Sequence, residues 1–183
     1  RYNTGKIPNI ILISIDTLSG EYFTPEHMPK TYGWAEQNAL IFKNAFTNCS
    51  WTKPSHLTML TGLLPHEHGV ELSRSIIPED LEMVQHELKE KGYKTIALVE
   101  SYYLDKSFGF DRGFDSYLRL SLFRAGEDKK FGGTMFEGAR ELFQKLEMPE
   151  YSDPPYMIFL HTNIIHGYRP QTEGDEPEAY RKA

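Results

Sequence analysis

The strongest constraint on the fold is a short apolar run near the start of the chain. Residues Asn9 to Ile15 are almost continuously apolar and rich in β-branched isoleucine. A run of this kind is typical of a β-strand covered on both faces, as in a largely parallel sheet. The run ends at Asp16, so the sequence predicts a buried strand with a carboxylate at its carboxyl end.

Helix and strand patterns alternate along the rest of the chain. The segment Pro78 to Lys91 has a proline and acidic residues at its start, one apolar face and Gly92 after it, which together predict a helix. The other predicted helices are Pro29 to Asn38 and Thr134 to Leu146, and the other predicted strands are Ala39 to Phe46, Tyr93 to Val99 and Tyr156 to Leu160. This alternation indicates βαβ units, so we expect an α/β fold with helices on both faces of the sheet.

The stretch from Trp51 to Gly62 combines hydroxyl side chains with the start of a short helix. Pro54 suits the first turn of that helix, and Gly62 suits its end. Thr52 is therefore expected just ahead of a helix N-terminus, where the helix dipole and the backbone N–H groups favour an anion and help a hydroxyl to ionise. An alcohol nucleophile needs this environment. Helix capping by Thr52 and Ser55 is the alternative interpretation.

Asp16 is a candidate metal ligand. Ligands in open α/β sheets gather at the carboxyl ends of the strands, where a carboxylate is well placed to hold a divalent metal ion. A turn or cap residue is the alternative interpretation. The segment His66-Glu67-His68 also places two histidines around a carboxylate, but this pattern has little specificity for zinc without a third ligand.

Composition argues against several classes of function. The chain has 183 residues, of which 39% are hydrophobic and 25% charged, and this fits one ordinary globular domain. A net charge of −6 without a dense Lys/Arg block argues against nucleic acid as a partner. No apolar run approaches the roughly 20 residues of a membrane-spanning helix, and no signal peptide is visible at Arg1. We expect a soluble piece of a longer protein, whose localisation and oligomeric state stay open.

Four segments, in order, resemble the alkaline phosphatase superfamily and its sulfatase branch. They are Asn9 to Leu18, then Thr52-Lys53-Pro54-Ser55-His56 followed by Leu60-Thr61-Gly62, Pro65 and His68-Gly69, then Gly109-Phe110-Asp111-Arg112-Gly113-Phe114-Asp115, and finally Phe159-Leu160-His161 with His166. Together they extend over most of the chain. The resemblance implies a three-layer α/β/α sandwich, similar to alkaline phosphatase, with a largely parallel central sheet.

The resemblance also implies roles for single residues. Thr52 stands at the nucleophile position, and Asp16 is expected to bind a divalent metal ion together with the Thr52 oxygen. The sequence does not distinguish Ca²⁺, Mg²⁺, Mn²⁺ and Zn²⁺. Lys53 and His56 are the candidates for charge compensation, with His56 at a position where many relatives have arginine. His166 is expected to contact the transferred group or the leaving oxygen.

The chain departs from the sulfatase pattern at the nucleophile position and again after the strand that ends at Val99. Many sulfatases convert a cysteine at the nucleophile position into formylglycine, whereas Thr52 stands there. Cys49 lies three residues too early and is expected to be a buried or half-buried structural residue. The Gly-Lys-x-His motif of these sulfatases is also missing after the strand that ends at Val99. We therefore expect phosphate esters to be preferred over sulfate esters as substrates. Separately, His161 is expected to be a packing or supporting residue.

The resemblance further implies that metal ligands are missing from this chain. Relatives complete the metal site with an Asp-His-Gly segment in their C-terminal half, and nothing after Tyr168 supplies one. Residues 1–183 are therefore expected to be the N-terminal part of a single sulfatase-like catalytic domain. This part would hold the nucleophile half of a metal-dependent hydrolase or transferase that forms a covalent Thr52 intermediate. On its own it is expected to be inactive or only weakly metal-binding.

Two other classes of protein remain as alternatives. A degenerate sulfatase-like module that binds or scaffolds without catalysis would explain the missing Gly-Lys-x-His motif. A phosphatase of the haloacid dehalogenase type would also place an Asp after the first strand. It needs a second Asp two residues later, where this chain has Leu18.

Overall fold

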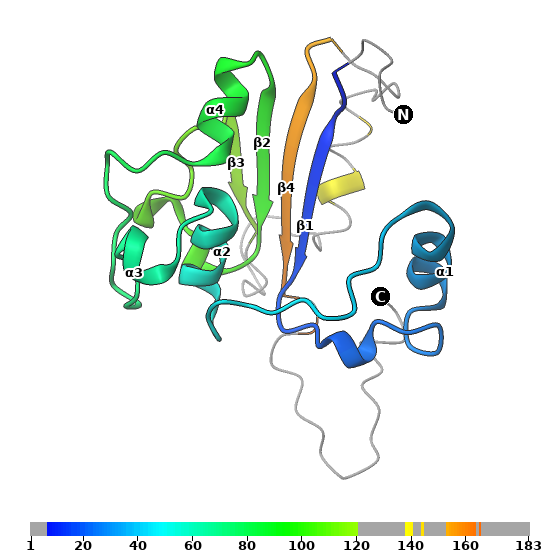
Figure 1. Ribbon diagram of the computed structural model, residues 1–183. Coiled ribbons are helices and arrows are strands. Elements are labelled where there is room, and N and C mark those ends of the chain that lie inside the picture. The colour runs from blue at the N-terminus through cyan, green and yellow to red at the C-terminus, as the bar shows by residue number, and fades with distance from the viewer. Residues whose placement is uncertain (1–6, 121–137, 141–143, 145–152, 164, 166–183) are drawn as a thin grey trace, which may run out of the picture. The chain divides into compact units, whose positions relative to one another are not determined.

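The structure is a computed structural model that describes residues 7–120, 138–140, 144, 153–163 and 165 (Figure 1). Its strands are β1 (Ile10–Ile15), β2 (Lys94–Val99), β3 (Ser116–Arg119) and β4 (Tyr156–Thr162). Its α-helices are α1 (Pro29–Asn38), α2 (Thr52–Thr61), α3 (Pro65–His68) and α4 (Val84–Glu90). Short 3-10 helices span Gly20–Tyr22, Tyr102–Leu104 and Lys106–Phe108. None of the described helices has the length and apolarity to cross a membrane.

The four strands form one sheet in the order β1-β4-β2-β3, and all four arrows point the same way in Figure 1. β2 pairs in parallel with both of its neighbours, so that Ala97 lies opposite Phe159 of β4 and Tyr117 of β3. The last described strand in the chain, β4, therefore lies beside the first, β1.

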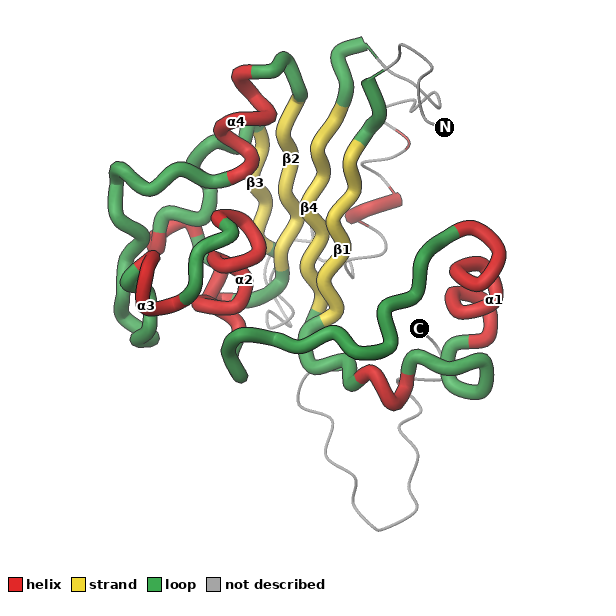
Figure 2. Tube along the Cα trace, viewed as in Figure 1, coloured by secondary structure: helices red, strands yellow, loops and turns green. Residues whose placement is uncertain are grey.

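Helical residues lie on both faces of the sheet (Figure 2). On one face, Leu57 of α2 packs in a cluster with Val99 of β2. On the other face, Ala139, from the helical residues 138–140, packs beside Leu98 of β2. This arrangement confirms the predicted α/β fold with a largely parallel sheet between helices. Of the helix predicted from Thr134 to Leu146, residues 138–140 and 144 are helical and the others lie outside the described residues.

The chain divides into two compact units. The first unit comprises residues 1–14 and 48–162, which include nearly all of the sheet together with α2, α3 and α4. The second unit comprises residues 15–47 and 163–183, and it contains α1. The bounds of α1 agree with the helix predicted there.

The prediction that both faces of the first strand are covered is wrong. Ile10 and Leu12 pack against the cluster that contains α2, but Ile11 and Ile13 are 46% and 61% exposed. Among the described strands β1 lies at the edge of the sheet. Side chains alternate between the two faces of any strand, so an apolar run does not reveal whether both faces are covered.

The helix predicted from Pro78 begins later, at Val84. Its N-cap is Met83, with an extended backbone, and the segment before it is irregular, with a turn at Glu79 and Asp80. The Arg112 guanidinium donates hydrogen bonds to the carbonyl oxygens of Glu79 at 2.7 Å and Pro78 at 2.9 Å. These carbonyls are therefore satisfied by a side chain far along the sequence, which local helix signals cannot indicate.

The predicted strand from Ala39 to Phe46 is not a strand. The structure has an irregular segment with one turn there, and Leu40, Phe42 and Phe46 are 79% to 92% exposed. Strand propensity is expressed only where a partner strand is present. None of the described strands pairs with this segment.

Candidate active site

Helix α2 places Thr52 at its first helical position, one residue further into the helix than the sequence predicts. The N-cap residue is Trp51, which has an extended backbone and makes no side-chain cap bond. Gly62 ends the helix with a φ of 75°, as predicted. The Ser55 hydroxyl donates to the Thr52 carbonyl oxygen at 3.1 Å, within the first turn of the helix. The N-cap position is thus occupied by Trp51 and not by Thr52 or Ser55.

Thr52 is nearly buried, with 7% of its surface exposed. The N–H groups of the first helical turn point out of the helix, and the positive end of the helix dipole lies at the same end. Thr52 thus lies at a helix N-terminus, close to where the sequence predicts it. Its role as a nucleophile stays a prediction.

The start of α2 lies beside the carboxyl ends of three strands. The ring of Trp51 meets the ring of Tyr103, just after β2, edge-on with centroids 5.6 Å apart. His56 meets His161, near the end of β4, at 4.8 Å. Ser14, near the end of β1, lies 2.9 Å from His56. This edge of a parallel sheet is where α/β folds place their ligands.

His56 is buried, and both nitrogens of its ring make hydrogen bonds. Its Nδ1 donates to the Thr52 carbonyl oxygen at 2.7 Å, and its Nε2 is 2.9 Å from the Ser14 hydroxyl. The ring also lies 6.1 Å from that of Phe159. These contacts hold His56 within the protein and leave its role in charge compensation a prediction.

Lys53 is fully buried, and its ammonium group reaches a loop beside α2. The Nζ atom donates to the carbonyl oxygens of Ser73 at 2.5 Å and Ser75 at 3.0 Å, and it lies 3.1 Å from the centre of the Phe108 ring. Burial lowers the pKa of Lys53 to about 8. The ammonium group therefore ties the first turn of α2 to the 73–75 loop.

The side chains of His161 and Thr162, which follow each other in β4, lie on opposite faces of the sheet. His161 is buried on the α2 face, together with Phe159 of the same strand. On the other face, the buried Thr162 hydroxyl donates to the Glu100 carboxylate at 2.8 Å. His161 thus packs against His56, as expected of a packing residue, and Glu100 is directed away from Thr52 by the alternation of side chains.

Asp16 lies in the second unit, in a turn that directly follows β1, and Thr17 after it has a φ of 66°. Its role as a metal ligand stays a prediction. His166 lies outside the described residues.

Of the two histidines that follow α2, His68 makes hydrogen bonds within the protein. His68, at the end of α3, is buried, accepts a hydrogen bond at Nδ1 from the Val70 N–H at 3.1 Å, and has Nε2 3.3 Å from the Thr58 hydroxyl. Gly69 follows with a φ of 71°. These contacts give His68 a structural role in the turn after α3. Burial lowers the pKa of His68.

A hollow of about 420 Å³ opens beside the start of α2. It is lined by Asn48, Cys49, Trp51, Pro54, Pro65, His66 and Glu71. Cys49 is half-buried, within the range that the sequence predicts. The indole ring of Trp51 and the side chains of His66 and Glu71 thus line the same hollow.

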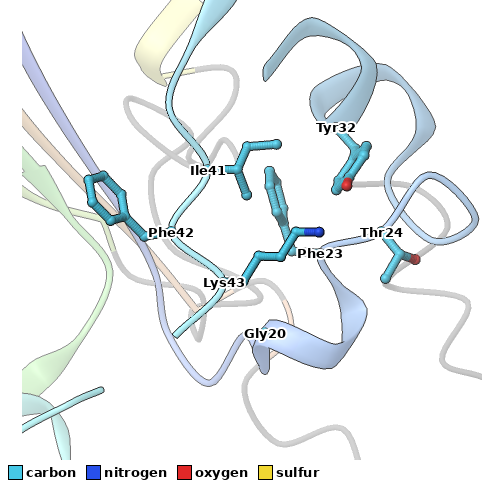
Figure 3. Close-up of a pocket in the computed structure, with 7 residues that line it drawn as sticks. All are labelled: Gly20, Phe23, Thr24, Tyr32, Ile41, Phe42 and Lys43. Atoms are coloured by element: carbon cyan, nitrogen blue, oxygen red, sulfur yellow. The ribbon is translucent and has the colours of Figure 1, made fainter. Parts of the chain in front are cut away.

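The second unit contains a separate hollow of about 310 Å³ (Figure 3). Its lining residues are Gly20, Phe23, Thr24, Tyr32, Ile41, Phe42 and Lys43. The rings of Phe23 and Tyr32 lie 5.4 Å apart, and Figure 3 shows Phe42 pointing away from them. No residue that the sequence analysis assigned to the site lines this hollow.

Sequence reasoning missed Ser14 and Tyr103. Ser14 is the one polar residue inside an apolar strand, two positions before Asp16, and this exception was the available signal. Tyr103 lies where the Gly-Lys-x-His motif is missing, and nothing in the local pattern ties it to Trp51.

Comparison with known proteins identifies relatives for most of the chain. A family model described as Sulfatase matches residues 8–182. The Delta 4,5-hexuronate-2-O-sulfatase of Bacteroides thetaiotaomicron is 23% identical over 112 residues. This match covers 56% of the chain and 23% of the relative.

Two solved structures share the fold. The phosphonate monoester hydrolase of Agrobacterium radiobacter has a TM-score of 0.67 at 16% identity, over 87% of this chain and 41% of that one. The C-terminal periplasmic domain of EcEptC from Escherichia coli, in complex with Zn, has a TM-score of 0.63 at 16% identity, over 88% and 45%. The chain thus spans less than half of the length of each of these three proteins.

Proposed function

The chain belongs to the sulfatase family, and from that premise we propose that it carries the nucleophile of an enzyme that cleaves or transfers phosphate or sulfate esters. The observation that supports this proposal most is the position of Thr52. It is the first residue of α2, nearly buried, at the edge where the ends of β1, β4 and β2 meet. Residues 52–62 also lie within the range that the family model matches, and their resemblance to the family's nucleophile segment supports the proposal.

In the proposed reaction, the Thr52 Oγ1 attacks the phosphorus or sulfur atom in line with the leaving oxygen. The bond to the leaving oxygen breaks, the proton that Thr52 Oγ1 gives up passes to the leaving alcohol, and an ester of Thr52 remains. Water or an acceptor alcohol then attacks this ester and the Thr52 hydroxyl is restored. Negative charge on the peripheral oxygens of the transferred group is offset by the N-terminal end of α2, because such catalysis is mostly positioning and charge stabilisation.

Asp16 and Thr52 are proposed to bind a divalent metal ion. A carboxylate and a hydroxyl suit a hard cation, but two ligands are fewer than such an ion takes. The described residues contain no group of three or more His, Cys, Asp or Glu side chains placed to hold a metal. The donor types therefore fit and the set is incomplete. Such an ion, when bound, would lower the pKa of the hydroxyl and offset the charge of a substrate oxygen.

The contacts of Lys53 and His56 favour supporting roles over direct contact with the substrate. Lys53 donates two hydrogen bonds to the 73–75 loop, and His56 uses both ring nitrogens inside the first unit. An arginine at the position of His56 could bind two oxygens of an anion with its planar guanidinium group, and histidine cannot make such a paired contact. We therefore expect the anion to be bound by backbone N–H groups and by residues such as His166.

Phosphate esters are proposed as preferred substrates over sulfate esters. The sequence lacks the lysine and histidine that the Gly-Lys-x-His motif supplies to sulfate, and β2 is followed by Glu100. A small-molecule ester could place its alcohol part in the hollow beside Trp51.

The covalent intermediate is tested by trapping it. The full-length protein is incubated with 4-nitrophenyl phosphate and Mn²⁺, quenched with acid and analysed by intact-protein mass spectrometry with peptide mapping. We expect one phosphate adduct, on Thr52, which disappears in Thr52→Ala. The matched control is Thr58→Ala, in the same helix and further from its start, which should keep the adduct.

Two outcomes would contradict the proposal. An adduct on another residue would show that Thr52 is not the nucleophile. No adduct together with no turnover of 4-nitrophenyl phosphate or 4-nitrophenyl sulfate would favour the degenerate binding module.

A further inference from the structure

We infer that Ser14 is a positioning residue for Thr52 and acts through His56. The starting observation is a chain of two hydrogen bonds between parts of the sequence that lie far apart. The Ser14 hydroxyl in β1 is 2.9 Å from His56 Nε2, and His56 Nδ1 is 2.7 Å from the Thr52 carbonyl oxygen. This chain links the end of the first strand to the first turn of α2.

The donor and acceptor roles in this chain follow from the chemistry of its ends. The carbonyl oxygen of Thr52 can only accept a hydrogen bond, so His56 Nδ1 carries a hydrogen. In neutral imidazole Nε2 is then an acceptor, and the Ser14 hydroxyl donates to it. In imidazolium both nitrogens donate and the hydroxyl accepts instead. Ser14 therefore holds the ring in either state of His56.

The rest of the surroundings fix the plane of the His56 ring. His161 meets it edge-on at 4.8 Å and Phe159 lies at 6.1 Å, and His56 is only 4% exposed. A ring held at both nitrogens and packed from the side has one orientation. The Thr52 carbonyl oxygen, and with it the first turn of α2, is therefore held at a fixed place relative to Ser14.

This placement matters for the proposed chemistry, on which the inference rests. An in-line attack depends on the position of the Thr52 oxygen, and a displacement of about 1 Å can cost on the order of 100-fold in rate. Ser14 touches neither the substrate nor the reacting oxygen in this account. Its effect would appear in kcat, and substrate binding would change little.

The test uses a set of variants that remove one or the other of the two hydrogen bonds. Ser14→Ala removes the hydroxyl, and Ser14→Thr keeps it. His56→Asn keeps an amide near the position of Nδ1, within reach of Thr52, but cannot reach Ser14. His56→Gln places its amide near Nε2, within reach of Ser14, and loses the bond to Thr52.

Kinetics of the full-length protein with 4-nitrophenyl phosphate and Mn²⁺ give the first readout. We expect Ser14→Ala to lower kcat roughly 10-fold to 100-fold, because a displacement of the reacting oxygen by up to about 1 Å has a cost of this order, while KM stays nearly constant. Ser14→Thr should recover most of the rate. In the Ser14→Ala/His56→Asn double variant, kcat should be no lower than in His56→Asn alone, because the contact is already lost.

A second readout does not depend on activity. In nitrogen-15 and carbon-13 NMR spectra of the metal-free protein, Ser14→Ala should shift the His56 Nε2 signal and the Thr52 methyl signal, respectively, whereas Ser14→Thr should leave both near their wild-type positions. An unchanged kcat in Ser14→Ala, additive effects in the double variant, or unchanged NMR signals would each overturn the inference. If the wild-type protein turns over neither 4-nitrophenyl ester but the signals shift as expected, the hydrogen-bond chain is supported and the proposed function fails.

Discussion

At the scale of single residues, Asp115 shows how a sequence marker acquires a physical role. It ends the Gly-Phe-Asp-x-Gly-Phe-Asp string, one of the four segments that carry the family resemblance. Its Oδ2 accepts the N–H of Thr95 at 2.9 Å, and its Oδ1 lies 2.7 Å from Lys89 Nζ. The hydrogen bond from Lys89 and that from Thr95 hold the pKa of Asp115 below its ordinary value. The carboxylate thus joins β2 and α4 to the loop before β3.

We predict that Asp115→Asn lowers the free energy of unfolding by about 1 kcal/mol near neutral pH, as expected for a charge-assisted hydrogen bond that is partly exposed. A carboxyl group whose pKa is lower in the folded state contributes stability above its unfolded pKa, 3.8, and loses it as the pH falls through the folded value. The difference between wild type and variant should therefore shrink below pH 3.8. Urea denaturation over a pH series measures it.

The control for this substitution is Asp111→Asn. Asp111 belongs to the same string and is half-buried, but its side chain has no hydrogen bond or ion pair among the described residues. Its substitution should change the unfolding free energy little at any pH. A loss as large as that of Asp115→Asn would contradict the role given to Asp115.

Thr52, Lys53 and His56 show what a motif cannot state. All three lie where the resemblance predicts, in one stretch at the start of α2. The sequence predicts that Lys53 and His56 compensate the charge of a bound anion. Their side chains contact Ser73, Ser75 and Ser14 within the protein. The destination of a long side chain depends on which distant carbonyl or hydroxyl lies within reach, and a motif contains no such information.

At the scale of elements, the start of α4 is decided by contacts from the Gly109–Gly113 loop. Gly113 has a φ of +78°, and a Cβ atom there would lie 2.8 Å from His86 Cδ2 and 2.9 Å from Gln85 Cγ. The loop backbone therefore approaches α4 more closely than any side chain would allow. Arg112, in the same loop, satisfies the carbonyls of the turn before α4.

We predict that Gly113→Ala lowers the free energy of unfolding by roughly 2–4 kcal/mol, because it adds a steric clash with α4 to the cost of the left-handed backbone. Gly92→Ala is the matched control, since Gly92 has a φ of +85° and no atom within 4 Å of the added Cβ. It should cost about 1 kcal/mol, from the backbone alone. Urea denaturation of both variants gives the comparison, and equal losses would rule out a close approach to α4.

At the scale of the whole molecule, we predict that residues 1–183 alone turn over 4-nitrophenyl phosphate far more slowly than a full-length protein. Asp16 and Thr52 are two ligands, fewer than a divalent ion takes, so the ion should be held weakly or not at all. Steady-state turnover and calorimetric titration with Mn²⁺, on both proteins, measure the difference. Equal turnover and equal Mn²⁺ affinity would show that this chain contains a complete site.

Most of the fold was predictable because its signals are local. The positions of β1, α1, β2 and β4 follow from apolar runs and helical spacing, and they were predicted to within about two residues. The failures were Ala39–Phe46, the outer face of β1 and the start of α4 at Val84. In each of these, the outcome depends on whether a distant segment pairs with, covers or bonds to the element.

The sequence by itself determined the α/β class, the family, and the place of Thr52 at the start of a helix, because strand periodicity, helix signals and motif spacing are properties of neighbouring residues. Only the tertiary structure decided which side chains meet at that helix. Ser14, His56 and His161 come from three segments, and they meet because the sheet order brings β1 and β4 together beside α2. A hydrogen bond needs two atoms within about 3 Å, and sequence separation carries no information about that distance.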